Sequence, residues 1–329
     1  MQRKPRIALL ATGGTIAGTA AEATQTTGYH AGALSLEALL QTVPNLTELA
    51  DLQCETLAAI DSKDLQPSLW QKLSARAEAL LANDYDGLVI THGTDTMEET
   101  AYYLHLTLHT HKPVVLTGAM LPATALSADG PRNLLDAVRV AASPDASDKG
   151  VLVVFQGEIH SARAITKTQT LAVTAFQSPG FGALGFVEGT HVRFYQSPLR
   201  LHTYQSVFQA LQDTWSFVPI LYAYAGDDGT LARLAWEHGA KAMVYAGMGN
   251  GSIPEKVEAI LQDITAAGIP VVRASRSVQG AVIEAEVSYQ RARFIPAGTL
   301  SPQKARLLLM LALQKTQDHE TLQKFFATY

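Results

Sequence analysis

Three segments of the sequence carry hydroxyl, carboxylate and ammonium side chains at places where catalysis could use them. The first, residues 11–18, reads Ala-Thr-Gly-Gly-Thr-Ile-Ala-Gly and directly follows a short apolar run. Ligands of open α/β sheets bind at the carboxyl ends of strands, and glycines there let the backbone approach a ligand closely. Thr12 and Thr15 are therefore placed for binding or for nucleophilic attack. The alternative interpretation is a tight turn with a capping threonine, and neither the dinucleotide-binding glycine pattern nor the Walker lysine is present.

The second segment, residues 89–100, reads Val-Ile-Thr-His-Gly-Thr-Asp-Thr-Met-Glu-Glu-Thr. Thr96, with a glutamate three residues later, fits a capping box and is predicted to be mainly structural. Thr94 and Asp95 then fall in the turn between strand and helix, where a hydroxyl beside a carboxylate indicates chemistry. We interpret His92 as a satisfied turn histidine in preference to a catalytic base.

The third segment, residues 161–170, places Lys167 among threonines. Taken alone, such a lysine is typical of a solvated loop. Close to Thr94, however, its amine could accept the proton of that hydroxyl and so activate it.

Apolar runs and helical patterns alternate along the chain. The apolar runs are typical of parallel strands buried on both faces, and they cover residues 6–11, 87–91, 113–118, 150–156, 218–224, 242–246 and 269–274. The helical patterns cover residues 67–82, 96–108, 131–142, 230–238, 254–267 and 302–315. This alternation predicts an α/β protein with a mostly parallel sheet.

The length of 329 residues favours two domains. The alternation breaks at about residues 193–217 and restarts at Val218. We therefore predict a catalytic α/β domain over residues 1–195, a linker over 196–217 and a smaller α/β domain over 218–329.

Composition argues against several classes of function. The net charge of −5 leaves no basic footprint for nucleic acid or an anionic membrane. No apolar stretch approaches the roughly 18 residues of a membrane span. The single cysteine, Cys54, cannot form an intramolecular disulfide and is expected to be a small buried side chain. The histidines lack zinc-ligand spacing, and we expect neither a metal nor an organic cofactor.

The apolar run near the N-terminus is too short for a signal peptide. We therefore expect a cytoplasmic protein, or a periplasmic one if a leader preceded this sequence.

Together the three segments resemble the bacterial-type L-asparaginase and glutaminase-asparaginase family. Thr-Gly-Gly-Thr-Ile is similar to the first family signature, and Thr-His-Gly-Thr-Asp-Thr-Met-Glu-Glu-Thr to the second. Further familial stretches lie at residues 118–120, 127–131, 166–168, 245–252 and 298–306. The resemblance covers nearly the whole chain and implies a larger N-terminal domain with a mostly parallel sheet and a smaller C-terminal α/β domain.

The resemblance also implies an L-asparaginase, with L-glutamine left open as a second substrate, and a homotetramer of intimate dimers. By matched position, Thr15 is the nucleophile and Tyr29, on a mobile loop, helps to activate it. Thr94, Asp95 and Lys167 form the second catalytic group, and which threonine attacks is left open. The remaining matched positions bind substrate: Asp61, Ser62, Thr94, Asp95 and the Ala119 backbone, with Ser252 and Glu286 reaching in from a partner chain.

Two features depart from the family pattern or leave it ambiguous. Lys63 stands where secreted members usually carry Gln or Glu, and a lysine cannot accept a hydrogen bond from a substrate ammonium. We expect Lys63 to turn away and to pair with Asp61, Asp64 or a neighbouring subunit's carboxylate. Glu284 lies close to Glu286, and the spacing favours Glu286.

Three rival functions fit parts of the sequence. A glutaminase-leaning enzyme is hard to separate, because one methylene discriminates by only about 1–3 kcal/mol. A non-catalytic amino-acid-binding module would have no use for the proton relay of Thr15, Tyr29, Thr94, Asp95 and Lys167. A subunit of a tRNA-dependent amidotransferase should carry an additional N-terminal domain, whereas the first predicted strand starts within a few residues of Met1.

Overall fold

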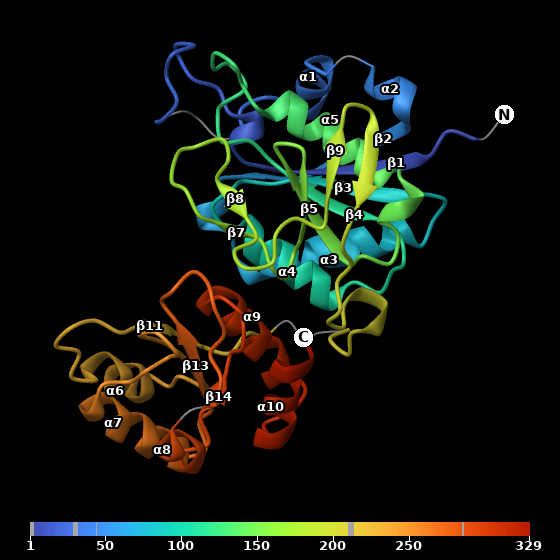
Figure 1. Ribbon diagram of the computed structural model, residues 1–329. Helices are drawn as coiled ribbons and strands as arrows, with labels where there is room; N and C mark the ends of the chain where they lie inside the picture. Colours follow the sequence, from blue (N-terminus) through green and yellow to red (C-terminus); the bar gives the residue numbers. More distant parts are fainter. Residues whose placement is uncertain (1–2, 29–31, 44, 210–213, 285) are drawn as a thin grey trace. The chain divides into compact units, whose positions relative to one another are not determined.

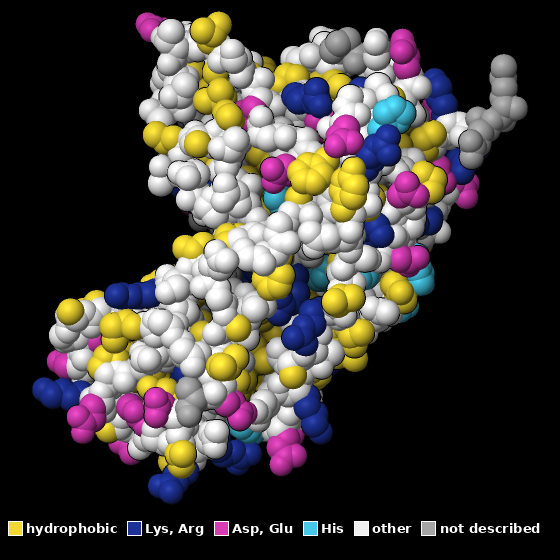
Figure 2. Space-filling model, in the orientation of Figure 1, with side chains coloured by type: hydrophobic (Ala, Val, Ile, Leu, Met, Phe, Trp, Pro, Cys, Tyr) yellow, Lys and Arg dark blue, Asp and Glu magenta, His cyan; other side chains and the backbone are white. Residues whose placement is uncertain are grey.

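The chain divides into two compact units, Met1–Gln209 and Ala210–Tyr329. The computed structural model (Figure 1) describes residues 3–28, 32–43, 45–209, 214–284 and 286–329. None of the helices within these ranges is long and apolar enough to cross a membrane. On the face shown in Figure 2, acidic and basic side chains are interspersed.

The N-terminal unit is built on an eight-stranded sheet with the order β10-β9-β6-β5-β4-β3-β1-β2. Its strands are β1 (Arg6–Gly13), β2 (Asp51–Ile60), β3 (Gly87–Thr91), β4 (Val114–Thr117), β5 (Val151–Phe155), β6 (Glu158–Ser161), β9 (Gly185–Glu188) and β10 (His191–Phe194). Neighbours from β2 to β5 pair in parallel, and β6, β9 and β10 add an antiparallel edge. The prediction of a mostly parallel α/β fold is confirmed.

Helices cover both faces of this sheet. On one face α5 (Gly130–Ala141) packs on β3, β4 and β5, beside α1 (Leu36–Gln41) and α2 (Leu46–Leu49). The helices α3 (Pro67–Leu81) and α4 (Met97–Thr107) contact each other, β3 and β5, and cover the opposite face. Because both faces are covered, the central strands read as continuous apolar runs, and this pattern made them recognisable in the sequence.

Several strands were absent from the sequence-based prediction. The strand β2 lies at the edge of the sheet, and its side chains are partly exposed, so its sequence shows no continuous apolar run. Strands β9 and β10 form an antiparallel pair of mixed polarity. The edge strands β2 and β10 each have only one neighbouring strand to bury them, and hydrophobicity alone therefore marks them poorly.

The C-terminal unit has a parallel sheet with the order β11-β12-β13-β14. Its strands are β11 (Ile220–Tyr222), β12 (Met243–Gly247), β13 (Val271–Ser275) and β14 (Ile295–Pro296), and its helices are α6 (Thr230–Glu237), α7 (Glu255–Ala266), α8 (Val287–Arg291), α9 (Pro302–Leu313) and α10 (His319–Thr328). The elements β14, α8 and α10 were not predicted. A second α/β layer structure with its own apolar core is nevertheless present, as expected.

Glycine backbones pack against each other where β1 and β3 end. A Cβ on Gly14 would lie 2.4 Å from Cα of Gly93, and a Cβ on Gly93 would lie 2.6 Å from the Ser62 hydroxyl oxygen. Gly14 also has a φ of 85° and a ψ of −175°, a backbone conformation essentially confined to glycine. The ends of β1, β2 and β3 can therefore approach this closely only while side chains are absent at these positions.

Replacing Gly14 by alanine should destabilise the N-terminal unit by several kcal/mol, because strain and overpacking add. Gly189 is a matched control: it has a φ of 63°, and a Cβ there would meet nothing within 4 Å. Gly189→Ala should lower the free energy of unfolding by only about 1–2 kcal/mol, which is the cost of placing a residue with a Cβ in the left-handed backbone conformation. Urea unfolding of both variants measures the difference, and equal losses would contradict the close-approach argument.

Candidate active site

A cavity of about 300 Å³ lies at the carboxyl edge of the N-terminal sheet. It brings together six of the residues predicted to catalyse the reaction or bind substrate: Thr15, Asp61, Ser62, Thr94, Asp95 and Lys167. Its remaining walls come from Gly14, Thr26, Thr27, Gly28, Lys63, Gly93, Met120, Thr170 and Leu171. Segments far apart in sequence thus meet because parallel strands end at the same edge.

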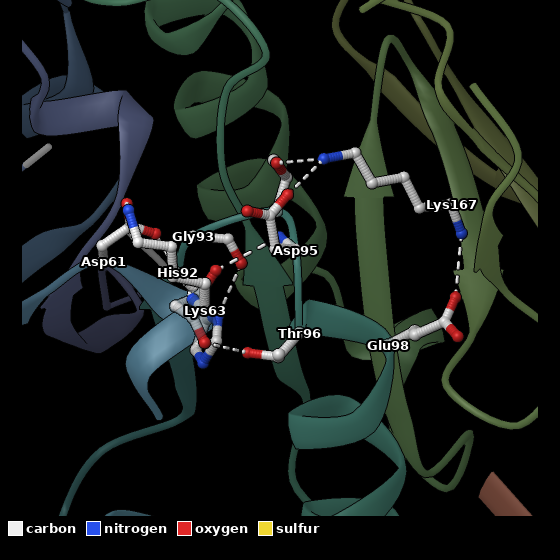
Figure 3. A network of polar contacts seen from close by, with 10 residues as sticks. Asp61, Lys63, His92, Gly93, Asp95, Thr96, Glu98 and Lys167 are labelled. Atoms are coloured by element: carbon white, nitrogen blue, oxygen red, sulfur yellow. Dashed lines mark hydrogen bonds and ion pairs between the residues drawn. The ribbon is translucent and has the colours of Figure 1, made fainter. Parts of the chain in front are cut away.

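Lys167 connects the two polar side chains of the β3–α4 turn (Figure 3). Its Nζ donates to Thr94 Oγ1 at 2.9 Å and to Asp95 Oδ1 at 2.7 Å. Thr94 is buried and Asp95 is exposed. Since the ammonium donates to Thr94 Oγ1, the hydroxyl hydrogen of Thr94 is directed to another acceptor.

Glu98 holds the backbone of Lys167 in place. Lys167 lies on β7 (Thr166–Lys167), which pairs with β8 (Phe176–Gln177) in a two-stranded sheet of its own. The buried Glu98 carboxylate, in the first turn of α4, accepts the backbone N–H of Lys167 at 2.8 Å. The sequence alone indicates no role for Glu98, apart from its position one helical turn after Thr94.

Ser62 joins β2 to the β3–α4 turn. It opens a short 3-10 helix after β2, and its Oγ accepts the backbone N–H of Asp95 at 3.1 Å. Its carbonyl accepts the Thr96 hydroxyl at 2.9 Å. The predicted capping box is therefore wrong: the Thr96 side chain makes no cap hydrogen bond, because its hydroxyl is turned toward Ser62.

Asp61 and Lys63 form the second ion pair of the cavity, with Nζ 2.8 Å from Asp61 Oδ2. The hydrogen bond from Lys63 lowers the pKa of Asp61, and the same bond raises the pKa of Lys63. The expected pairing of Lys63 with Asp61 is confirmed, although Lys63 also lines the cavity. The four charged side chains that line the described cavity thus form two ion pairs, Asp61–Lys63 and Asp95–Lys167.

Thr15 is buried and begins a 3-10 helix after β1. It follows Gly14, and Thr94 follows Gly93, so the contact between these two glycines brings the threonines to neighbouring positions. Tyr29, the expected activator of Thr15, lies outside the described residues.

The turn after β4 is held by a buried carboxylate. Ala119 is fully buried, and the next residue, Met120, lines the cavity. Asp129 accepts the backbone N–H groups of Met120 and Leu121 at 2.9–3.1 Å. Burial raises the pKa of Asp129, and these hydrogen bonds act in the opposite direction. The sequence marked this stretch as familial without indicating the role of Asp129.

Ser252 and Glu286 lie in the C-terminal unit. Ser252 is exposed in the loop after β12, where it bridges to Met248. Glu286 is exposed and directly precedes α8. Glu284, the alternative to Glu286, accepts a hydrogen bond from Gln323 at 3.0 Å.

His92 is a structural histidine. It is 1% exposed, and its Nδ1 lies 2.7 Å from the Gly93 carbonyl, which can only accept. Nδ1 therefore carries the hydrogen, and Nε2 accepts from the Thr100 hydroxyl at 3.0 Å. Thr100 in turn accepts from Trp70 Nε1. This chain of bonds satisfies a neutral imidazole, and burial lowers the pKa of His92 to about 4.

Stability should therefore fall in acid as His92 becomes charged. The folded pKa of about 4 lies below the ordinary value of 6.5, so the unfolded chain binds the proton more readily between these values. The contribution of neutral His92 to the free energy of unfolding is fully present above pH 6.5, and it declines by up to about 3 kcal/mol as the pH falls to 4.

The matched variant is His92→Asn, because its amide retains a donor near the Nδ1 position but does not titrate. Its free energy of unfolding, measured by urea titration at each pH, should fall less steeply than that of the wild-type protein between pH 6.5 and 4. Parallel curves for the two proteins would show that His92 is not responsible.

Comparison with known proteins identifies the family of this chain. The family model described as Asparaginase, N-terminal matches residues 6–200, and that of the Glutaminase/Asparaginase C-terminal domain matches residues 217–326. The L-asparaginase 2 of Bacillus subtilis is 42% identical over 327 residues, covering 99% of this chain and 87% of the relative. A probable periplasmic L-asparaginase of Haemophilus influenzae is also 42% identical, covering 99% and 93%.

A solved structure shows the same fold. The probable cytoplasmic L-asparaginase of Campylobacter jejuni superposes with a TM-score of 0.96 at 45% identity, covering 99% of this chain and 100% of that one. The family resemblance seen in the sequence is confirmed.

Proposed function

Since this chain belongs to the asparaginase family of amidohydrolases, we propose that it hydrolyses L-asparagine to L-aspartate and ammonia at the cavity described above. The observation that carries the proposal is the position of Lys167 Nζ, within hydrogen-bond reach of both Thr94 and Asp95. Cleavage of an amide needs a group that transfers a proton to the departing nitrogen, and the Thr94 hydroxyl, polarised by Lys167, can serve as that group.

The charges of the cavity suit a zwitterionic amino acid. Two carboxylates and two ammonium groups line it, so the cavity offers charges of both signs to the ammonium and the carboxylate of a zwitterion. We assign Asp95 and Asp61 to the substrate ammonium. Ser62 Oγ already accepts the Asp95 N–H, and its own hydrogen can donate to the substrate carboxylate.

The reaction proceeds in two steps. Thr15 Oγ1 forms a bond to the side-chain amide carbon, the C–N bond breaks, and the hydroxyl proton passes through the hydroxyl groups of the site to the departing nitrogen. Ammonia leaves, and an acyl-enzyme remains. Water then attacks the ester carbon, the bond to Thr15 breaks, and a proton returns to Thr15 as aspartate is released.

Thr94 is assigned to proton transfer because its oxygen accepts from Lys167. A charged donor polarises the Thr94 hydroxyl, so its hydrogen is more readily given to the departing nitrogen. The same pair orients the water of the second step. Asp95 anchors the Lys167 ammonium, and the backbone at Ala119, fixed through Asp129, faces the amide. This scheme requires no metal or organic cofactor.

The oligomer and its location complete the proposal. A homotetramer of intimate dimers would let Ser252 and Glu286 of one subunit complete the cavity of another. Both side chains are exposed, which supports this assignment. We place the enzyme in the cytoplasm, as for the probable cytoplasmic L-asparaginase of Campylobacter jejuni, or in the periplasm if a leader precedes this sequence, as for the probable periplasmic relative of Haemophilus influenzae.

Ammonia release from asparagine and glutamine, measured side by side, tests the activity. One methylene separates these substrates, so discrimination of about 1–3 kcal/mol is expected, with asparagine preferred. Absence of ammonia from both amides would refute the proposal.

Removing either catalytic hydroxyl should lower turnover of asparagine by about 10³-fold or more. Thr15→Val and Thr94→Val delete the hydroxyl while preserving side-chain volume. Thr12→Val is the control: Thr12 is also a buried threonine near the end of β1, but its hydroxyl donates to the Thr91 carbonyl. Because one hydrogen bond is lost, the free energy of unfolding of the control should fall by about 1 kcal/mol, whereas its turnover of asparagine should stay unchanged. Near-normal turnover in either test variant would remove that threonine from the mechanism.

Lys63→Gln should change the Michaelis constant for asparagine only a few-fold, because Lys63 is already paired with Asp61. Two free cations about 4 Å apart would instead repel by several kcal/mol at an effective dielectric near 20. A gain in affinity of roughly a hundredfold in Lys63→Gln, close to 3 kcal/mol, would show that Lys63 opposes the substrate ammonium.

A further inference from the structure

Arg273 is the largest fully buried side chain of the C-terminal unit, with 1% of its surface exposed. It lies in the middle of β13, and its guanidinium carbon lies 4.5 Å from the centre of the Tyr289 ring. None of the carboxylates among the described residues lies within ion-pairing distance of it, and its Nε has no hydrogen-bond partner there. Burying such a cation is costly, so the guanidinium needs a reason beyond packing.

The hydrogen bonds of Arg273 supply that reason, because they join two loops. Nη1 donates to the Asn250 carbonyl at 2.9 Å and to the Gly251 carbonyl at 3.4 Å. Nη2 donates to the Ile283 carbonyl at 2.8 Å. The first two carbonyls belong to the loop after β12, and the third belongs to the loop between β13 and α8.

Both loops carry a residue assigned to the active site of a neighbouring subunit. Ser252 directly follows Gly251, and Glu286 lies three residues after Ile283. One additional bond, from Ile283 N to Asn250 Oδ1 at 2.9 Å, links the same loops. A planar guanidinium with donors on both ends can fix the spacing of two loops, which a methionine or leucine of similar size cannot do.

We propose that Arg273 is a positioning residue for substrate binding in trans: it sets the relative positions of Ser252 and Glu286, which then meet the substrate ammonium in the partner's cavity. This inference rests on the proposed function and on the tetramer. Glu286 contributes binding more than chemistry, so loss of Arg273 acts on the Michaelis constant more than on kcat.

The first test is Arg273→Met. The Michaelis constant for asparagine should rise about tenfold to a hundredfold, as for a displaced binding group, with kcat changed only a few-fold. Arg273→Lys should fall between wild type and Arg273→Met, because an ammonium donates to carbonyls but lacks the fork that spans both loops. Arg306→Met is the control, since Arg306 donates to the Val218 carbonyl and touches neither loop through that bond. An unchanged Michaelis constant in Arg273→Met overturns the proposal.

The second test mixes subunits after sedimentation has shown that each variant assembles as a tetramer. Arg273→Met subunits retain an intact cavity, and Thr15→Val subunits retain intact loops. In mixed tetramers some sites combine both intact parts, so a fraction with the wild-type Michaelis constant should reappear. If it does not, Arg273 acts within its own subunit and the proposal is wrong.

Mixing also separates this inference from the proposed function. Full activity of Thr15→Val alone, or a wild-type protein that releases no ammonia, would refute the catalytic assignment itself. If Arg273→Met fails to fold, the same mixing experiment with Arg273→Lys decides the question.

Discussion

The close contact between Gly14 and Gly93 is the constraint on which the catalytic unit depends. A parallel sheet brings strand ends to one edge, but ordinary side chains would hold the β1 and β3 loops apart. Glycine at both positions, with Ser62 against Gly93, lets three loops meet through their backbones. The two threonines that follow these glycines then reach one cavity, and the hydroxyl chemistry is a consequence of this backbone packing.

Buried polar groups behind the cavity hold the backbone of the segments that line it. Glu98 anchors the backbone of Lys167, Asp129 anchors the turn at Met120, and neutral His92 anchors the carbonyl of Gly93. Each makes bonds to backbone, which is how a buried polar side chain offsets its loss of hydration. The cavity itself is charged but balanced, because Lys63 and Lys167 each have an acidic partner.

The C-terminal unit shows the same principle with the opposite charge. Arg273 is buried beneath two loops and donates hydrogen bonds to their carbonyls. In the N-terminal unit, Asp129 in the same way accepts hydrogen bonds from backbone N–H groups of the turn after β4. In both places one buried polar side chain fixes the backbone of a loop through several hydrogen bonds. Charge-assisted bonds suit this purpose, since they are stronger and more directional than those between neutral groups.

The sequence by itself determined the α/β class, the central strands and the residues that could do chemistry, because buried parallel strands are continuous apolar runs and their carboxyl ends carry Thr15, Thr94 and Asp95. It did not reveal β2 or the antiparallel edge, whose burial depends on neighbours distant in sequence. Tertiary structure alone decided the partners of Lys63 and Lys167 and the turning of Thr96 toward Ser62. It also decided which backbone groups Glu98 and Arg273 contact. Side-chain hydrogen bonds depend on distances between segments, and local sequence patterns do not contain those distances.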